Sequence, residues 1–330
     1  MRVLGKYGPA LQVCVALAIA AVTLTRSSGQ TDGPAPALQD EVQVGYVYVP
    51  IVVRSQDGYV RDLERDDFQL FVDGRPAAFD SFETGATAPI SLVVLQDLSG
   101  SMANGGKLAA SRVAVRYLLD HARPGDEFSL VWFAGGVFQI DVPFTTDRGA
   151  LRQALDKWEA YGKTALQDAV AKLPGVIHDR PGVKRAALLI TDGVDNASSI
   201  DAEQARQVLR AAEVPVYVLG LGAGPEVEKE KDADSAEAYR IADMLGLLAS
   251  RTGGRYHALS GPEALSLAGA EVLEDLRHQY VLGFTMGGSG VPRDHRLDVV
   301  VRGRRNRAVS FRHGYFGLAP EATVTSNRKR

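Results

Sequence analysis

Short runs of apolar residues alternate with segments of helical periodicity between residues 90 and 279, and this alternation restricts the possible folds more than any other feature. The run Ser91–Leu95 is apolar on both faces, which is typical of strands buried between two layers of helices. Alternation of such strands with helices predicts an α/β domain with a doubly wound, mostly parallel sheet. The predicted strands are Ser91–Leu95, Phe128–Phe133, Ala186–Ile190, Val214–Leu219 and Arg255–Leu259; the predicted helices are Leu108–Leu119, Asp147–Trp158, Thr164–Leu173, Ile200–Ala212, Ala236–Arg251 and Pro262–Gln279.

The segments on either side of this domain lack helical periodicity and alternate in the manner of strands. Residues 40–89 contain the runs Val42–Arg54 and Phe68–Val72, and Asp73-Gly74 follows the second as a turn signal. Residues 280–318 contain three further runs, at Tyr280–Thr285, His295–Arg302 and Ala308–His313. We therefore expect the two segments to combine into one small β-sandwich-like domain, with the α/β domain inserted between them. Residues 319–330 are polar, and we expect a disordered tail.

The N-terminus has the features of an export signal. Arg2 and Lys6 precede the apolar run Ala10–Leu24, after which the chain turns polar. The run has about 15 residues, fewer than the ~20 that span a bilayer. Residues 1–29 are therefore predicted to be a secretory leader, with an uncleaved N-terminal anchor as the alternative, and residues 30–39 a linker. This predicts an exported protein that is periplasmic, secreted or associated with the cell envelope.

Composition excludes several classes of function. The 330 residues carry a formal net charge of −3, which does not favour a nucleic-acid partner or a polybasic membrane surface. Hydrophobic residues make up 45% of the chain, enough for a substantial core. The single cysteine, Cys14, lies in the predicted leader, so we expect neither disulfides nor a thiolate metal site in the remainder.

Oxygen-bearing side chains follow the predicted strands at the edge where ligands bind in open α/β sheets. Asp97, Ser99 and Ser101 come directly after the first buried strand, and alternate residues of an extended turn point the same way. Thr164 opens a predicted helix, and Asp192 follows the strand Ala186–Ile190. Two carboxylates and three hydroxyls are hard ligands that suit Mg²⁺ or Mn²⁺. The sequence therefore predicts a metal site at this edge.

The five residues, in this order and context, resemble the metal-ion-dependent adhesion site (MIDAS) of von Willebrand factor A (VWA) domains. The stretch Asp97-Leu98-Ser99-Gly100-Ser101 has the characteristic spacing, and Thr164 and Asp192 supply the remaining ligand positions. The resemblance covers roughly residues 90–259. It implies a Rossmann-like fold and Mg²⁺ held by these residues, with Asp192 often acting through water. It also implies that an Asp or Glu carboxylate of a protein partner completes the coordination shell.

The flanking segments resemble those of a bacterial exported VWA-related subfamily. The stretch Val49-Pro50-Ile51-Val52-Val53 before the domain and Tyr280-Val281-Leu282-Gly283-Phe284 after it are similar to that subfamily. One departure is Lys163, at a position where such motifs often have glycine, and we expect its charge to weaken the ion or to pair with an incoming anion.

A metal-dependent phosphohydrolase of the haloacid-dehalogenase type is the alternative, because it too places an aspartate after a first strand. That chemistry requires a general acid two residues after the nucleophile, and here the residue is Ser99, which does not supply a proton as a carboxylic acid does. The sequence thus favours an interaction module that is not an enzyme. We interpret Asp195 and Asn196 as a solvated loop, and we expect Met102 to pack beneath the metal-binding loop.

Overall fold

The computed structural model describes residues 45–84, 88–177, 184–193, 195–201, 204–205, 214–221, 233–287, 291–303 and 308–320. The predicted leader, the linker, most of the predicted helix at Ile200–Ala212 and residues 321–330 lie outside the described residues. Among the helices that the structure describes, none is both long and apolar enough to cross a membrane.

The α/β part is built on a six-stranded sheet in the order β11-β10-β9-β6-β7-β8. Every neighbouring pair is parallel except β7 and β8, which are antiparallel. The glycines at 135 and 136 have φ of 57° and 81°, which permits the tight turn that reverses the chain between these two strands. The strands are β6 (Ser91–Asp97), β7 (Glu127–Ala134), β8 (Val137–Thr145), β9 (Arg185–Thr191), β10 (Val216–Leu221) and β11 (Tyr256–Leu259). The expected mostly parallel sheet is therefore present.

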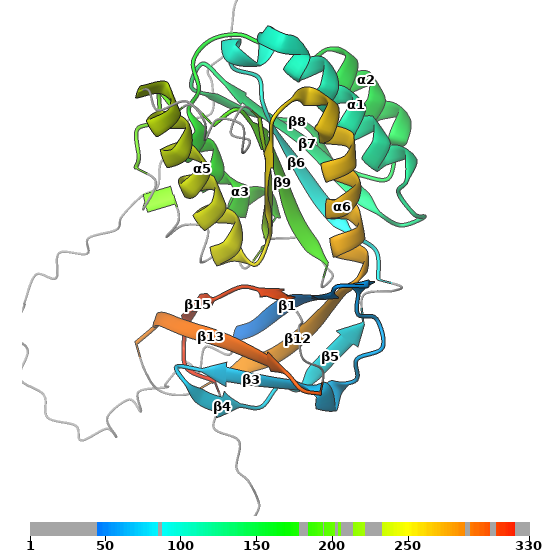
Figure 1. Cartoon of the computed structure of the whole chain (residues 1–330), viewed down its shortest axis with the longest axis vertical. Helices are drawn as coiled ribbons and strands as arrows, with labels where there is room; N and C mark the ends of the chain where they lie inside the picture. Colours follow the sequence, from blue (N-terminus) through cyan, green and yellow to red (C-terminus); the bar gives the residue numbers. More distant parts are fainter. Residues whose placement is uncertain are drawn as a thin grey trace, which may run out of the picture. The chain divides into compact units, whose positions relative to one another are not determined.

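Helices cover both faces of this sheet, as the continuously apolar strands require (Figure 1). Leu92 and Val94 of β6 pack in one core with α1, α2 and α6, whereas Val93 and Leu95 pack in a second core with α3 and α5. This division follows from the alternation of side chains along a strand. The helices are α1 (Lys107–Asp120), α2 (Arg148–Asp156), α3 (Leu166–Ile177), α5 (Ala233–Thr252) and α6 (Leu265–Arg277), with 3₁₀ turns at Arg65–Asp67 (η1), Gly100–Gly106 (η2) and Pro262–Ala264 (η4).

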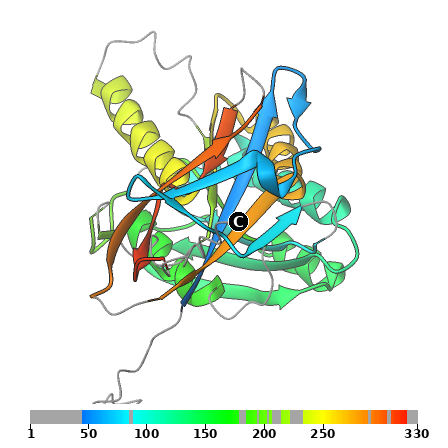
Figure 2. The same cartoon turned by 90° about the horizontal axis from the view of Figure 1, so that it is seen from below.

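The two flanking segments pair with each other in two antiparallel sheets (Figures 1 and 2). One sheet has the order β14-β1-β12-β5 with β2 beside β1, and the other has the order β15-β13-β3-β4. In each sheet a strand from residues before the α/β part pairs with one from residues after it, as in β1 with β12 and β3 with β13. The strands are β1 (Gly45–Ser55), β2 (Gly58–Tyr59), β3 (Phe68–Val72), β4 (Arg75–Ala77), β5 (Ser81–Thr84), β12 (Gln279–Met286), β13 (Arg293–Val301), β14 (Ala308–Phe311) and β15 (Gly314–Gly317).

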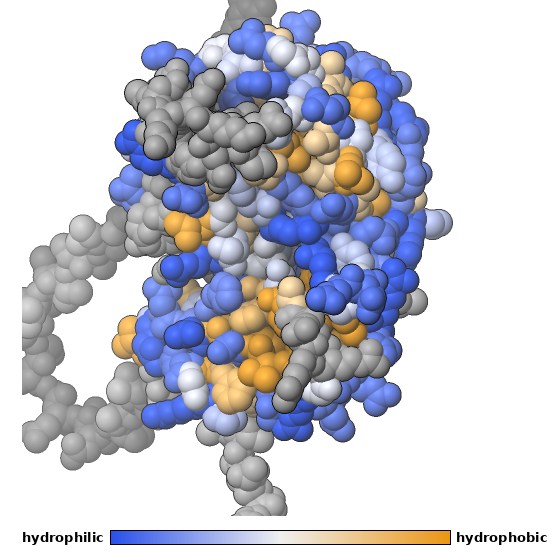
Figure 3. Space-filling view, in the orientation of Figure 1, coloured by the Kyte–Doolittle hydropathy of each residue, from blue (hydrophilic) through white to orange (hydrophobic). Residues whose placement is uncertain are grey.

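Both antiparallel sheets contribute to a single hydrophobic cluster. Ile51 of β1 and Leu282 of β12 come from one sheet, and Leu70 of β3 and Leu297 of β13 come from the other. Neither segment could form this core alone, because each supplies only some of its strands. In the view of Figure 3, apolar surface gathers over these sheets, and the surface of the α/β part is mostly hydrophilic.

Several predicted boundaries differ from those observed. Thr164 lies before α3, which begins at Leu166, so Thr164 does not open the helix as expected. Gln279, assigned to the last helix, is the first residue of β12. Ala319 was assigned to the disordered tail, yet its carbonyl accepts a hydrogen bond of 3.1 Å from the Gly287 N–H. In each case a long-range partner decides the boundary, and the local pattern does not contain that information.

A buried carboxylate connects α6 to the first antiparallel sheet. Asp275 is 2% exposed and forms an ion pair with Arg54 of β1. Its Oδ1 also accepts a hydrogen bond of 2.5 Å from the Tyr59 hydroxyl, and its Oδ2 lies 3.5 Å from Arg255 Nε. Burial raises the pKa of Tyr59 to about 12, so this hydroxyl keeps its proton and remains a donor. The negative charge of Asp275 is therefore well compensated.

Candidate metal site

Two predicted metal ligands lie at the adjoining carboxyl ends of β6 and β9. The two strands are parallel neighbours with Gln96 opposite Ile190, so Asp97 and Thr191 come next on each strand. The Thr191 hydroxyl donates a hydrogen bond of 2.6 Å to Asp97 Oδ2, and Asp97 is fully buried. Asp192 follows Thr191 directly, so the pairing of the two strands brings both carboxylate-bearing residues to one edge of the sheet.

The loop after β6 folds back on Asp97. Asp97 Oδ1 accepts a hydrogen bond of 2.8 Å from the Ser99 backbone N–H, and the hydroxyl oxygens of Ser99 and Ser101 lie 3.1 Å apart. The backbone turns at Met102, whose N–H donates a hydrogen bond to the Ser99 carbonyl. The Met102 side chain is fully buried in the core, as predicted. The structure thus brings Asp97, Ser99 and Ser101 together as their alternating spacing predicts.

Thr164 is held by its backbone to the other loops of this edge. Its N–H donates to Asn196 Oδ1 over 2.9 Å, and its carbonyl accepts from the Asn196 N–H over 3.1 Å. The preceding turn is bonded to the loop after β6, since the Gly100 N–H donates to the Gly162 carbonyl over 3.0 Å. Gly162 has φ of 71°, and a Cβ there would lie 3.0 Å from Gly135 Cα, so this close approach requires glycine. Thr164 is buried beside the loop that carries the two serines.

Asp192 forms an ion pair with a lysine side chain that was not predicted from the sequence. Lys107 Nζ lies 2.9 Å from Asp192 Oδ2, and the Asp192 side chain is 5% exposed. The other oxygen, Asp192 Oδ1, is buried without a hydrogen-bond partner among the described residues. Lys163, which we expected to place its charge near the metal, has an exposed side chain, and its backbone carbonyl accepts from the Gly135 N–H. Lys107 is thus a cation in direct contact with a predicted ligand, and the expected effect of Lys163 on the ion stays a prediction.

The electrostatics of the site favour an added cation. Burial raises the pKa of Asp97 to about 6, and the nearby charge of Asp192 also raises it, whereas the hydrogen bonds from Thr191 and Ser99 lower it. A buried carboxylate that only hydroxyl and amide donors contact is costly to ionise. A divalent cation would relieve that cost at Asp97 and would also give Asp192 Oδ1 a partner. The donors at this edge thus fit the predicted group.

The ligand chemistry determines which ion could bind. Among the residues that the structure describes, no three His, Cys, Asp or Glu side chains gather closely enough to hold a metal ion. A metal at this edge would therefore require the hydroxyls of Ser99, Ser101 and Thr164 beside the two carboxylates. Such an all-oxygen set suits Mg²⁺ or Mn²⁺, which retain water where protein ligands are few.

Asp195 and Asn196 lie in a loop, half-buried and exposed respectively, so the interpretation of a solvated loop holds for their exposure but missed their hydrogen bonds. Asp195 Oδ2 accepts hydrogen bonds from the Gln167 N–H (3.0 Å) and from the Ser198 hydroxyl (2.6 Å). Gln167 is in the first turn of α3, where backbone N–H groups have no partner within the helix, so Asp195 caps α3 from another loop. Together with the bonds between Asn196 and Thr164, this contact fixes the segment after β9 against the start of α3.

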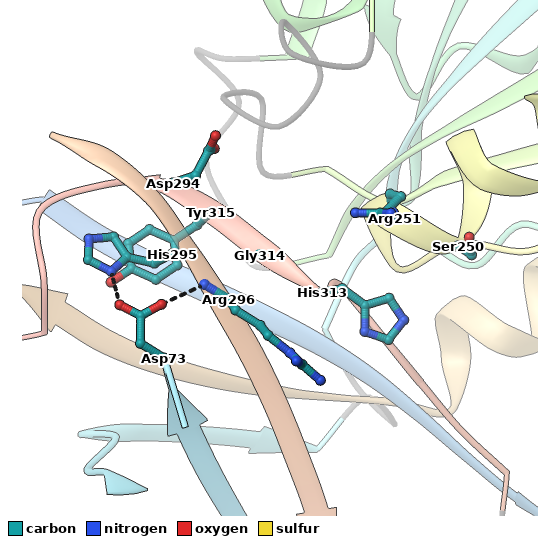
Figure 4. Close-up of a pocket in the computed structure, with 9 residues that line it drawn as sticks. All are labelled: Asp73, Ser250, Arg251, Asp294, His295, Arg296, His313, Gly314 and Tyr315. Carbon is teal, nitrogen blue, oxygen red and sulfur yellow. Dashed lines mark hydrogen bonds and ion pairs between the residues drawn. The ribbon is translucent and has the colours of Figure 1, made fainter. Parts of the chain in front are cut away.

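A different polar cluster lies in the antiparallel sheets, at a pocket of about 680 Å³ (Figure 4). Asp73 Oδ1 accepts from the Arg296 N–H over 3.0 Å, and Oδ2 is 2.8 Å from Arg293 Nη2 and 2.9 Å from His295 Nδ1. The Arg296 amide is the main cause that lowers the pKa of Asp73 to about 2. His295 also stacks on Tyr315, with ring centroids 4.9 Å apart. Because both oxygens of Asp73 already have hydrogen-bond or ion-pair partners, this cluster is a weaker candidate for a metal site than Asp97 and Asp192.

Thr191 and Lys107 are the site residues that sequence reasoning missed. Thr191 ends a strand that neighbours the one ending at Asp97, and side chains at matching positions of neighbouring parallel strands lie on the same face of the sheet. Lys107 follows two glycines at a helix start, and only its folded contact with Asp192 shows that it belongs to the site.

Comparison with known proteins agrees with the fold. Residues 92–194, which include all five predicted ligands, match the family described as von Willebrand factor type A domain. The match bears out the resemblance to VWA domains over these residues; the intact metal site and the exported bacterial subfamily stay predictions.

Similar individual proteins are distant. An uncharacterized protein of Borreliella burgdorferi is 25% identical over 189 residues, 53% of this chain and 55% of that protein, so the match spans about half the length of the relative. A solved von Willebrand factor type A protein from Catenulispora acidiphila is 14% identical, with a TM-score of 0.47 over 85% of this chain and 75% of its own. Proximal thread matrix protein 1 from the mussel byssus, solved with a zinc-occupied MIDAS motif, is 17% identical, with a TM-score of 0.45 over 58% of this chain and 49% of its own.

Proposed function

We propose that the protein is an exported interaction module that binds Mg²⁺ or Mn²⁺ and, through the bound ion, a carboxylate of a partner protein. The ligands would be Asp97, Ser99, Ser101, Thr164 and Asp192. One observation above all supports this proposal: two buried carboxylates lie at adjoining strand ends, and among the described residues only hydroxyl and amide groups and a single lysine compensate their charge. Buried carboxylates in such a setting are candidates for function because they cost stability.

The residues of the chain have separate parts in this mechanism. Asp97 would contribute the principal charge, while Thr191 and the Ser99 N–H hold its carboxylate in one orientation. Ser99 and Ser101 would add neutral oxygens, so the site supplies at most two negative charges. A divalent ion there keeps an exchangeable coordination position with residual positive charge. An Asp or Glu of a partner is a strong ligand for that position, because a charged oxygen replaces water at an interface where Coulomb attraction is strong.

We propose no enzymatic activity. Phosphoryl transfer by the haloacid-dehalogenase route would need a proton donor two residues after Asp97, and Ser99 there donates only weakly acidic hydroxyl protons. The predicted ligands and the side chains that contact them include three titratable groups, Asp97, Asp192 and Lys107, and the lysine is paired with a carboxylate. This composition supports a binding site more than a nucleophile activated by a base.

We also propose export, on the basis of residues 1–29 with their basic start and apolar run. An exported location would place the module where divalent cations are abundant and where envelope or extracellular proteins are its partners. Whether the leader is cleaved would follow from N-terminal sequencing of the protein recovered from its native envelope.

The direct test is metal-dependent capture of partners. The tagged protein would be incubated with native envelope extract in Mg²⁺ or in EDTA, and bound proteins would be compared by mass spectrometry. We expect partners that EDTA releases and that Asp97→Ala and Asp192→Ala lose, with far-UV circular dichroism showing that both variants are folded. The matched control is Asp120→Ala, which removes an exposed carboxylate on α1 and should retain binding.

Two outcomes would contradict this function. Capture that is unchanged by EDTA would place the interaction surface elsewhere, for instance on the antiparallel sheets. Metal-dependent hydrolysis of a phosphate ester that Asp97→Asn abolishes would favour the phosphohydrolase.

A further inference from the structure

Lys107 occupies a position that disfavours a lysine. It is the first residue of α1, where the helix macrodipole is positive and a cation is destabilising. The chain reaches this position through Gly105 and Gly106, whose φ values of 61° and 74° fall in the left-handed region that favours glycine. Two permissive residues thus turn the backbone from the loop of Ser99 and Ser101 directly into the helix that begins with Lys107.

The contact of Lys107 with Asp192 compensates for this placement. The ammonium lies 2.9 Å from Asp192 Oδ2, and the side chains of Lys107 and Asp192 are 25% and 5% exposed. A carboxylate as buried as Asp192 is costly without a partner, and Lys107 is its only ion-pair partner among the described residues. Asp192 Oδ1 has no hydrogen-bond partner among the described residues, so their compensation of this carboxylate is incomplete.

We propose that Lys107 is the resident cation of the metal-free site and competes with the divalent ion for Asp192. This inference rests on the proposed function and concerns the regulation of the same site. A divalent ion bound beside Asp192 lies close to the lysine charge, and like charges a few ångströms apart in a partly buried setting repel strongly. The ammonium must therefore move away or remain at an energetic cost, and either response weakens binding of the metal.

The proposal gives Lys107 two effects of opposite sign. In the metal-free protein the lysine stabilises the fold, because it neutralises Asp192. In the metal-bound protein it opposes the ion, so the site binds metal more weakly than its oxygen ligands alone would. An anionic partner adds negative charge at the metal and offsets that repulsion, so metal and partner should bind more tightly together than separately.

The test is a titration of the full chain with Mn²⁺, in which electron paramagnetic resonance measures the free ion. Lys107→Met removes the charge and preserves most of the length of the side chain. We expect it to lower the Kd for Mn²⁺ about three- to tenfold, the scale of one partly exposed ion pair. Lys157→Met, which removes an exposed lysine at the end of α2, is the matched control and should change the Kd less than twofold.

Two further measurements separate competition from other roles. In EDTA, Lys107→Met should have a lower Tm than the wild-type protein, while Lys157→Met should not. In an Asp192→Asn background, Lys107→Met should no longer tighten Mn²⁺ binding, because the carboxylate for which the two cations compete is absent.

The contrary outcomes are distinct. Weaker Mn²⁺ binding by Lys107→Met would overturn the proposal and show that the lysine positions Asp192 for the metal. An unchanged Kd with a lower Tm in EDTA would also overturn it and leave the ion pair as an anchor for α1. Absence of Mn²⁺ binding in both the wild-type and the Lys107→Met protein would overturn the metal site itself and, with it, the proposed function.

Discussion

Buried carboxylates occur in two contrasting environments in this molecule. Asp275, where α6 meets the first antiparallel sheet, is contacted by Arg54, by Arg255 and by the Tyr59 hydroxyl. Asp97, at the end of β6, is equally buried, yet its contacts are with the Thr191 hydroxyl and the Ser99 amide. The first environment supplies two positive charges to one carboxylate, whereas the described residues around Asp97 supply none in direct contact.

The difference indicates what each carboxylate does. A charge that is neutralised within the fold contributes to joining two parts of the chain, and removing it leaves cations without a partner. A charge that the fold buries and leaves without a cation makes the folded state less stable unless something from outside binds there. Asp275 therefore belongs to the architecture, whereas the setting of Asp97 and Asp192 supports a binding site.

The largest expected effect is at Asp275. Asp275→Ala should lower the free energy of unfolding by about 3–5 kcal/mol, because two guanidinium groups lose their buried partner. Urea denaturation followed by tryptophan fluorescence would measure this change. Asp120→Ala, which removes an exposed ion-pair partner of Arg152, should cost less than about 1 kcal/mol. Similar costs for the two variants would remove the distinction between structural and surface carboxylates.

A smaller effect of opposite sign is expected at Asp97 in the metal-free protein. Its folded-state pKa of about 6 lies above its ordinary value of 3.8. The folded state therefore holds the proton more tightly, so the stability contributed by this group is fully present below about pH 4 and is lost as the pH rises through about 6. That loss amounts to about 3 kcal/mol. A neutral variant such as Asp97→Asn avoids the loss, but its weaker hydrogen bonds cost it about 1 kcal/mol in return.

Asp97→Asn should consequently be more stable than the wild-type protein by about 2 kcal/mol at pH 7.5 in EDTA, and the advantage should shrink toward pH 4. Urea denaturation at several pH values measures both curves. The same variant should lose the rise in Tm that Mg²⁺ or Mn²⁺ gives the wild-type protein. A variant less stable than the wild type at pH 7.5 in EDTA would show that Asp97, like Asp275, is compensated within the fold.

The smallest expected effect is at Thr191, which orients Asp97. Thr191→Val preserves the shape of the side chain and removes the hydroxyl donor, so only the Ser99 N–H still orients the Asp97 carboxylate among the described contacts. We expect the Kd for Mn²⁺ to rise about tenfold, as is typical when a residue that orients a metal ligand is lost. Thr191→Ser retains the hydroxyl and should remain within about threefold of the wild type. Equal Kd values for the two variants would show that the hydroxyl does not orient Asp97.

Much of the α/β part could be predicted because its signals are local. The apolar run at β6 indicated a strand covered on both faces, and its alternate residues do enter two separate helical cores. Asp147 was the first residue of a predicted helix, and it caps α2, since its Oδ1 accepts hydrogen bonds from the N–H groups of Gly149 and Ala150. The spacing of Asp97, Ser99 and Ser101 likewise indicated that they would converge, because it depends on only a few neighbouring residues.

The sequence by itself thus determined the layers of the α/β part and the oxygen-bearing residues at its edge. The layers follow from short-range periodicity, and the edge residues follow from their positions directly after predicted strands or at the start of a predicted helix. Only the tertiary structure decided which charges compensate which. Lys107 and Asp192 are 85 residues apart, Thr191 and Asp97 are 94 apart, and Arg54 and Asp275 are 221 apart. Such pairs form because the packing of distant strands and helices brings their side chains within reach, and local patterns do not specify distances across a folded chain.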